Sequence, residues 1–117
     1  MFFDLSFLIL VGFGGLMIGM ALITKLFPAK KPNRIYGYRT DRTLRNPKTW
    51  KFAQLLLPAI FLRLGLYHIV AGIAWYLMPR LSDSLGLMVF FAVLILGFTI
   101  EITRSEAKVK KFSREKN

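Results

Sequence analysis

The chain has 117 residues, a length that allows one domain. Hydrophobic residues make up 55% of it and aromatic residues 15%, the formal net charge is +11, and cysteine is absent. Three apolar segments, at about 5–27, 55–78 and 85–102, leave too little polar sequence to coat three soluble helices. A membrane-spanning helix needs about 20 mostly apolar residues. The composition therefore predicts an all-α membrane protein with three transmembrane helices and a single domain over residues 1–117.

The first apolar segment, at about 5–27, is predicted to remain in the membrane as a helix. No positive charge precedes it, its lysines come at its end and after it, and no small-residue cleavage pattern marks its end. Three of its glycines share one helix face, and such a groove lets two backbones approach closely in lipid: Gly12, Gly15 and Gly19. The groove serves either packing within the chain or a dimer interface, so a homo-oligomer is one of the two assemblies that the sequence predicts.

A basic, polar segment at about 28–52 follows and is predicted to be a structured loop. It carries Tyr36, Gly37 and Tyr38, a glycine between two amphipathic rings, which is not typical of a disordered linker. Arg39 and Thr40 come next and have two possible roles. They bind a carbonyl, a headgroup phosphate or a partner's carboxylate, or they only fold the loop onto the helix ends.

The end of this loop is predicted to lead into the second helix. Asn46 followed by Pro47 is typical of a helix start, with asparagine as the N-cap and proline at the first helical position. Trp50 is then expected at the membrane interface, where amphipathic rings are enriched.

The second apolar segment, at about 55–78, carries small or polar residues on two faces. Gly65, His68 and Gly72 share one face, and Ala59, Arg63, Tyr67 and Val70 share another. We therefore expect packing neighbours on both sides, with Gly65 and Gly72 at a helix contact. His68 is expected to be a packed, hydrogen-bonded residue rather than a proton relay. A lone histidine without cysteines or clustered carboxylates predicts no metal site.

Arg63 lies about 12 Å inside its apolar segment, at 1.5 Å per residue. An unpaired arginine at the centre of a membrane helix costs at least ~2.5 kcal/mol. Glu101, near the end of the third segment, belongs to the same half of the bundle. One prediction is therefore an Arg63–Glu101 ion pair or a water-filled polar cleft open to the cytoplasm. In the alternative, Arg63 extends back to the headgroups and never meets Glu101.

The distribution of positive charge predicts the orientation. Nine of the seventeen lysines and arginines lie between Lys25 and Lys51, and six follow Ile102. Positive loops stay in the cytoplasm, so the loop at 28–52 and the tail at 103–117 are predicted to be cytoplasmic and the N-terminus outside. The tail is expected to prolong the third helix and then fray. Attraction to anionic lipids at the cytoplasmic face also accounts for these charges, so no nucleic-acid partner is predicted.

The acidic residues are scattered and form no pair on one face of a membrane helix. The sequence contains no Ser-His-Asp arrangement, no phosphate-binding glycine loop and no thiol. We therefore expect a protein that is not an enzyme and that needs no cofactor.

The loop motif carries a family resemblance. The pattern Asn33-x-x-Tyr36-Gly37-Tyr38-Arg39-Thr40, followed by Leu44, Asn46 and Trp50, resembles the SdpI/YfhL family of bacterial membrane proteins. The likeness extends to the layout of three helices, a signature loop and a basic tail. It implies a multi-pass protein of the bacterial cytoplasmic (inner) membrane. The signature positions that it carries over are Asn33, Gly37, Arg39, Thr40, Asn46 and Trp50.

The founding member of that family protects its producer from a secreted killing-factor peptide and also holds a small repressor at the membrane. The resemblance therefore implies immunity to a membrane-active peptide toxin as the leading function. One alternative is a signalling or scaffold module whose basic loop recruits a cytoplasmic partner such as a repressor. A small oligomeric transporter is another alternative.

Overall fold

The computed structural model describes residues 5–31, 37–78 and 82–116, and every regular element within them is a helix. The helices are α1 (Leu5–Leu26), α2 (Asp41–Arg45), α3 (Pro47–Leu77) and α4 (Asp83–Lys116). Three of these, α1, α3 and α4, are long and apolar enough to cross a membrane. Many large apolar side chains lie exposed along them, as expected of helices that face lipid. The predicted all-helical, three-span architecture is confirmed.

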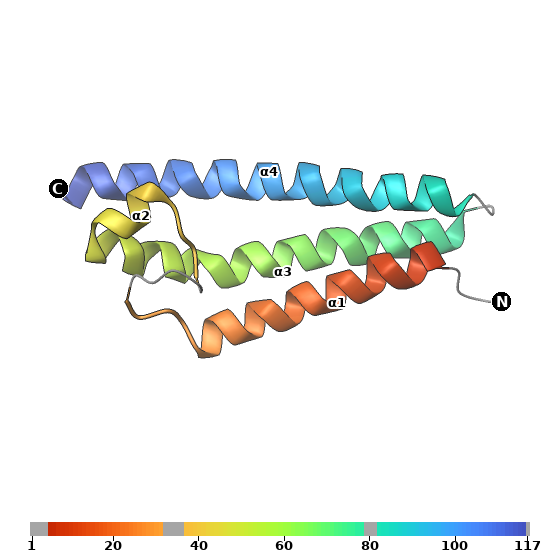
Figure 1. The fold of residues 1–117 in the computed structure, drawn as a ribbon, viewed down its shortest axis with the longest axis horizontal. Helices are drawn as coiled ribbons and strands as arrows, with labels where there is room; N and C mark the ends of the chain where they lie inside the picture. The colour runs from red at the N-terminus through yellow and green to blue at the C-terminus, as the bar shows by residue number, and fades with distance from the viewer. Residues whose placement is uncertain (1–4, 32–36, 79–81, 117) are drawn as a thin grey trace.

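Helix α3 lies between α1 and α4, and α2 packs against α3 and α4 at one end of the bundle (Figure 1). The chain reverses direction twice, so α3 runs opposite to both of its neighbours (Figure 1). The bundle measures 55 × 24 × 20 Å. The end that holds α2, the last turn of α1 and the first turns of α3 is called the loop end below.

Two glycines allow α1 and α3 to cross in close contact. A Cβ at Gly65 would lie 2.6 Å from the Gly14 carbonyl oxygen, and a Cβ at Gly14 would lie 2.7 Å from the Gly65 carbonyl oxygen. Gly72 makes a second close approach, where a Cβ would lie 2.7 Å from Val11 Cγ2. Gly65 and Gly72 therefore lie at a helix contact, and the missing side chains let the backbones meet.

The glycine groove of Gly12, Gly15 and Gly19 does not form this contact. A Cβ at any of the three would meet nothing within 4 Å. The face of α1 that docks onto α3 is instead the one that carries Leu10 and Gly14. The predicted role in packing within the chain is therefore wrong, because the three glycines point away from α3. The other predicted role, a contact between two copies, stays a prediction.

At the loop end, α2, the start of α3 and the end of α4 extend beyond the last turn of α1 (Figure 1). Helix α3 begins at Pro47, earlier than the predicted span at about 55–78, and α4 continues through the predicted tail to Lys116. The rings of Phe52 and Phe112 stack with centroids 4.3 Å apart, and Val109 is fully buried. The tail is therefore a packed helix against α3. We call α2, the loop at 37–40 and residues 47–57 and 103–116 the juxtamembrane unit.

Candidate functional site

Gly37 and Tyr38 lie against the start of α3. Gly37 has a φ of 108°, which favours glycine, and a Cβ there would lie 2.6 Å from Gln54 Oε1. The Tyr38 backbone N–H donates to Gln54 Oε1 at 2.8 Å, and Gln54 Nε2 donates to the Tyr38 carbonyl at 3.0 Å. Because Tyr38 and Gln54 are both buried, this amide replaces the hydrogen bonds that water would make to the loop backbone.

The side chain of Tyr38 extends the contact to α4. Its ring is buried, and its hydroxyl donates to Glu106 Oε1 at 2.9 Å. Burial raises the pKa of Tyr38 above its ordinary value, and the hydrogen bond and negative charge of Glu106 raise it further. Tyr38 therefore stays a protonated donor at neutral pH and ties the loop to both α3 and α4.

Thr40 and Thr43 form a reciprocal cap on α2. The Thr43 backbone N–H donates to Thr40 Oγ1 at 3.3 Å, and the Thr40 backbone N–H donates to Thr43 Oγ1 at 2.8 Å. Thr43 is fully buried, and its hydroxyl lies 3.2 Å from the Tyr38 carbonyl oxygen. The capping box thus starts a helix of only five residues and joins it to the loop.

Asn46 and Trp50 fix the next turn. Asn46 Oδ1 accepts hydrogen bonds from the backbone N–H groups of Lys48 at 2.8 Å and Thr49 at 3.4 Å, so Asn46 is the N-cap of α3. Trp50 is fully buried, and its Nε1 donates to the Ala29 carbonyl at 2.8 Å. The Trp50 ring is therefore packed within the chain, and its expected place at the membrane interface stays a prediction. Its indole N–H binds the linker that leaves α1.

Arg39 differs from these motif residues. Its side chain is exposed, and it makes no hydrogen bond or ion pair with any residue in the described part of the chain. It lines a groove of about 310 Å³ whose apolar wall comes from α3 and α4: Leu57, Ile60, Phe61, Phe98 and Ile102. Gly37, Tyr38, Thr40, Asn46 and Trp50 hold the fold, whereas the Arg39 guanidinium lies beside an apolar surface with no partner among the described residues. Asn33 and Tyr36, two further signature residues, lie outside the described residues.

Replacing Gly37 with alanine is expected to loosen the loop by about 1–3 kcal/mol, the usual range for a strained backbone conformation. The new methyl group would also meet Gln54 Oε1 and disturb the amide pair with Tyr38. Trypsin should then cut the arginines within residues 39–45 faster than in the wild type. Gly19→Ala, at a position with open space, is the control and should leave the cleavage rate unchanged. Equal rates for Gly37→Ala and the wild type would contradict this account of the loop.

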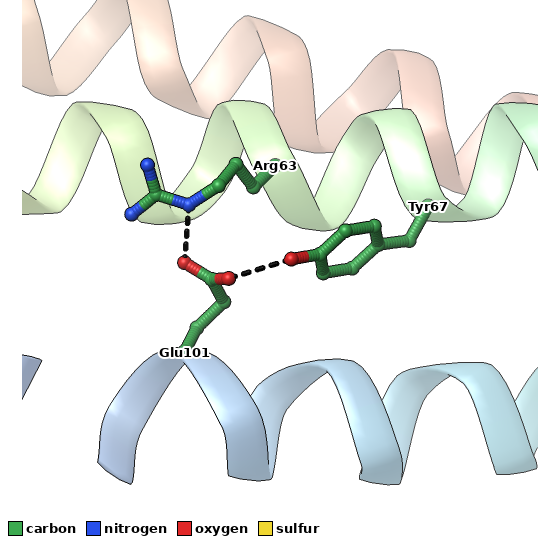
Figure 2. A network of polar contacts seen from close by, with 3 residues as sticks. All are labelled: Arg63, Tyr67 and Glu101. Atoms are coloured by element: carbon green, nitrogen blue, oxygen red, sulfur yellow. Dashed lines mark hydrogen bonds and ion pairs between the residues drawn. The ribbon is translucent and has the colours of Figure 1, made fainter. Parts of the chain in front are cut away.

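A second polar cluster joins α3 to α4 (Figure 2). Arg63 Nε lies 2.6 Å from Glu101 Oε1, and the Tyr67 hydroxyl donates to Glu101 Oε2 at 2.7 Å. The side chain of Glu101 is 1% exposed and that of Arg63 is 42% exposed. Each carboxylate oxygen thus has a donor from α3, and the charge of Glu101 is compensated where water is excluded. Of the two alternatives for Arg63, the structure has the ion pair.

The room for this cluster comes from Gly97. A Cβ at Gly97 would lie 2.9 Å from the Tyr67 ring and 3.3 Å from Leu64. Gly97 precedes Glu101 by one turn on the same face of α4, so the small residue lets the Tyr67 ring lie against α4. A charged donor, a hydroxyl donor and a buried acceptor arranged in this way stabilise the α3–α4 contact inside the apolar zone.

His68 lies apart from this cluster. It is fully buried, and its Nδ1 lies 2.8 Å from the Leu64 carbonyl oxygen, which fixes Nδ1 as the protonated nitrogen. Its ring contacts the rings of Phe13 and Phe90, with centroids 4.7 and 5.4 Å away, and those two rings also contact each other at 5.2 Å. Nε2 has no hydrogen-bond partner among the residues that the structure describes. The structure thus places His68 in an aromatic contact between all three long helices.

The sequence comparisons bear on both polar clusters. The pattern that defines the SdpI/YfhL protein family matches residues 30–103 of the chain. The chain is also 33% identical over 105 residues to the protein named "Uncharacterized protein YfhL" of Bacillus subtilis (strain 168), covering 90% of each sequence. The chain belongs to the SdpI/YfhL family. No solved structure matches it.

The SdpI/YfhL match begins in the loop and ends just after Glu101. It therefore contains the loop motif, all of α2 and α3, and the residues of the Arg63 cluster. The predicted family resemblance is confirmed over this region. The end of α4, which closes the juxtamembrane unit with Val109 and Phe112, lies beyond the matched residues.

Sequence reasoning missed three polar residues of the two clusters: Gln54, Thr43 and Glu106. It placed Tyr67 on the same face as Arg63 but assigned it no contact. Only weak signals pointed to them. Gln54 is a lone amide at the edge of an apolar segment, and Tyr67 follows Arg63 by one turn of the same helix. Glu106 looked like part of a solvated basic tail, because its contact with Tyr38 spans 68 residues of sequence.

Proposed function

We propose that this chain is an immunity protein of the SdpI type, which protects a bacterium from a membrane-active peptide toxin. The observation that carries the proposal is that Arg39, one member of the family's loop motif, has no partner among the described residues, while the described motif residues Tyr38, Thr40, Asn46 and Trp50 hold the fold. A side chain that does no structural work within a structured motif is a candidate for binding. The proposed action is binding rather than catalysis.

The proposed location is the bacterial cytoplasmic membrane, with the loop end and the C-terminus in the cytoplasm and the N-terminus outside. The excess of lysine and arginine in the loop and in the end of α4 supports this orientation. The groove beside Arg39 then lies where the apolar part of the bundle meets the cytoplasmic headgroups.

This groove suits a peptide that enters the membrane. Its wall of α3 and α4 side chains would contact the apolar face of the peptide. Arg39 would bind a carboxylate of the same peptide, because a guanidinium pairs with a carboxylate through two parallel hydrogen bonds. An occupied groove would remove the peptide from the pool that damages the bilayer.

The proposal is tested by measuring whether the chain protects bacteria from killing by such peptides. The chain is expressed in a bacterium that is sensitive to secreted membrane-active peptides, and survival is compared with that of cells carrying an empty vector. We expect survival at peptide concentrations that kill the control cells. If the chain is correctly inserted and protects against none of the peptides, the immunity proposal fails.

A second candidate function is recruitment of a cytoplasmic partner, such as a repressor. The observation that favours it is the juxtamembrane unit, which extends past the end of α1 and offers exposed basic residues on one face of α4: Arg104, Lys108 and Lys111. Reversing two charges with Lys108→Glu and Lys111→Glu is expected to release an acidic partner from the membrane while leaving peptide protection intact. Loss of protection in this variant would instead link the α4 surface to immunity.

A further inference from the structure

A second, larger groove opens between α1 and α3 at the loop end. The two helices meet closely at Gly14 and Gly65. They diverge toward the loop end (Figure 1). The groove has a volume of about 540 Å³, within the range of small-molecule sites. Its apolar wall is formed mainly by Ile18, Leu22, Leu55, Pro58, Ala59 and Leu62.

The polar groups of the groove leave a single charged side chain free. The Thr24 hydroxyl donates to the Met20 carbonyl of its own helix at 2.9 Å, and both ends of the Gln54 amide bind Tyr38. Lys25 lines the same groove, is exposed, and makes no hydrogen bond or ion pair with any residue that the structure describes. The groove thus combines an apolar wall with one unpaired ammonium group.

A second lysine, Lys51, lies on the face of α3 that forms the groove. Lys51 precedes Leu55 by four residues, so it occupies the same face one turn nearer the loop end. It is exposed, and it too has no hydrogen-bond or ion-pair partner among the described residues. Because helical side chains lean toward the N-terminus of their helix, Lys51 leans away from the apolar wall. Its ammonium group therefore belongs at the mouth of the groove.

The position of the groove along the bundle suits a bound lipid. Lys25 marks the end of the apolar part of α1, so the groove occupies the last turns of the membrane span and its mouth opens at the headgroups. In a membrane placed this way, the apolar wall would face the acyl chains and the two lysines would face the headgroup phosphates. The residues that line the groove include no carboxylate that would compete for the lysines.

We propose that this groove binds an anionic phospholipid, with one acyl chain between α1 and α3 and the phosphate held by Lys25 and Lys51. The two positive charges select an anionic headgroup over a zwitterionic one. This lipid site lies on a different side of α3 from the Arg39 groove and does not depend on the immunity role.

The test is native mass spectrometry of the detergent-purified chain, titrated with phosphatidylglycerol or with phosphatidylcholine. We expect one phosphatidylglycerol to bind more tightly than phosphatidylcholine. Lys25→Gln and Lys51→Gln should each weaken phosphatidylglycerol binding about fivefold, the effect of one basic residue near an anionic surface. The double variant should bind the two lipids equally.

Two further variants separate the groove from general charge. Ala59→Phe places a ring in the groove from an exposed position and should weaken binding of both lipids. Arg45→Gln with Lys110→Gln removes the same charge from exposed positions elsewhere at the loop end and should leave binding unchanged. Equal affinity of the wild type for the two lipids would overturn the proposal. It would also be overturned by full binding to Ala59→Phe, or by an equal loss in the control pair.

Discussion

Replacing Gly65 with valine is expected to prevent the native contact between α1 and α3. The first added carbon would lie 2.6 Å from the Gly14 carbonyl oxygen and 2.8 Å from Ile18 Cγ1, and a backbone atom cannot move aside as a flexible side chain can. Even Gly65→Ala should lower the free energy of unfolding by about 1–3 kcal/mol, as overpacking usually does. Valine should lower it further and reduce the folded yield. The measurement is SDS-induced unfolding in mild detergent, followed by circular dichroism.

The chain offers a matched control for this substitution. Gly15 lies on α1 next to Gly14, but a Cβ at Gly15 would meet nothing within 4 Å. Gly15→Val should therefore leave the unfolding midpoint of the single chain nearly unchanged. If Gly15→Val destabilises the chain as much as Gly65→Val does, the assignment of the packing face is wrong. An effect of Gly15→Val confined to a dimer would support the remaining role of the glycine groove.

Replacing Arg63 with methionine is expected to lower the free energy of unfolding by about 2–3 kcal/mol, somewhat less than the ~3–5 kcal/mol lost when a fully buried pair is broken. The loss arises because Glu101 stays buried while its charged partner is gone. The value is reduced because Arg63 is 42% exposed and because Tyr67 still donates to Glu101. The same unfolding assay measures the change.

A double-mutant cycle isolates the pair. Arg63→Met combined with Glu101→Gln removes both charges and keeps an acceptor for Tyr67, so it should recover at least half of the stability lost by Arg63→Met alone. Lys110→Met, which removes one exposed charge, is the control and should change stability by less than about 0.5 kcal/mol. Simple addition of the two single effects would show that Arg63 and Glu101 are not coupled.

The sequence predicted the parts of this fold that depend on local pattern. Long apolar segments predict spans whatever their partners, and Asn46 with Pro47 predicts the start of α3 because a cap acts within one turn. The pairing of Arg63 with Glu101 was one of two alternatives, since antiparallel helices bring the two residues to the same half of the bundle. Their contact is then favoured, because an unpaired charge inside the apolar part of a membrane costs free energy.

What the sequence could not give depends on the rotation and register of whole helices. A lone Gly14 carries less signal than three spaced glycines, yet it is the residue that meets Gly65. Tryptophan is a residue type that is common at membrane interfaces, so its type did not predict burial within the chain. Trp50 is buried because the linker passes over it at Ala29. Val109 looks like part of a polar tail until the tail is placed against α3.

The same limit applies to the loop motif. Its residue types gave no way to separate binding from folding, because tyrosine, threonine, asparagine and tryptophan serve both. The contacts separate them: Tyr38, Thr40, Asn46 and Trp50 bind other residues of the chain, whereas Arg39 has no hydrogen bond or ion pair with any described residue. The central claim is therefore that Arg39, among the motif residues that the structure describes, acts outside the fold.

The most direct test of this claim compares peptide protection by Arg39→Ala with protection by Arg45→Ala, at equal amounts in the membrane. Both variants remove one exposed arginine from the loop end, and neither residue has a partner among the described residues. We predict that Arg39→Ala loses protection, that Arg45→Ala keeps it, and that Arg39→Ala unfolds at the wild-type midpoint. Protection by Arg39→Ala equal to that of the wild type would contradict the account.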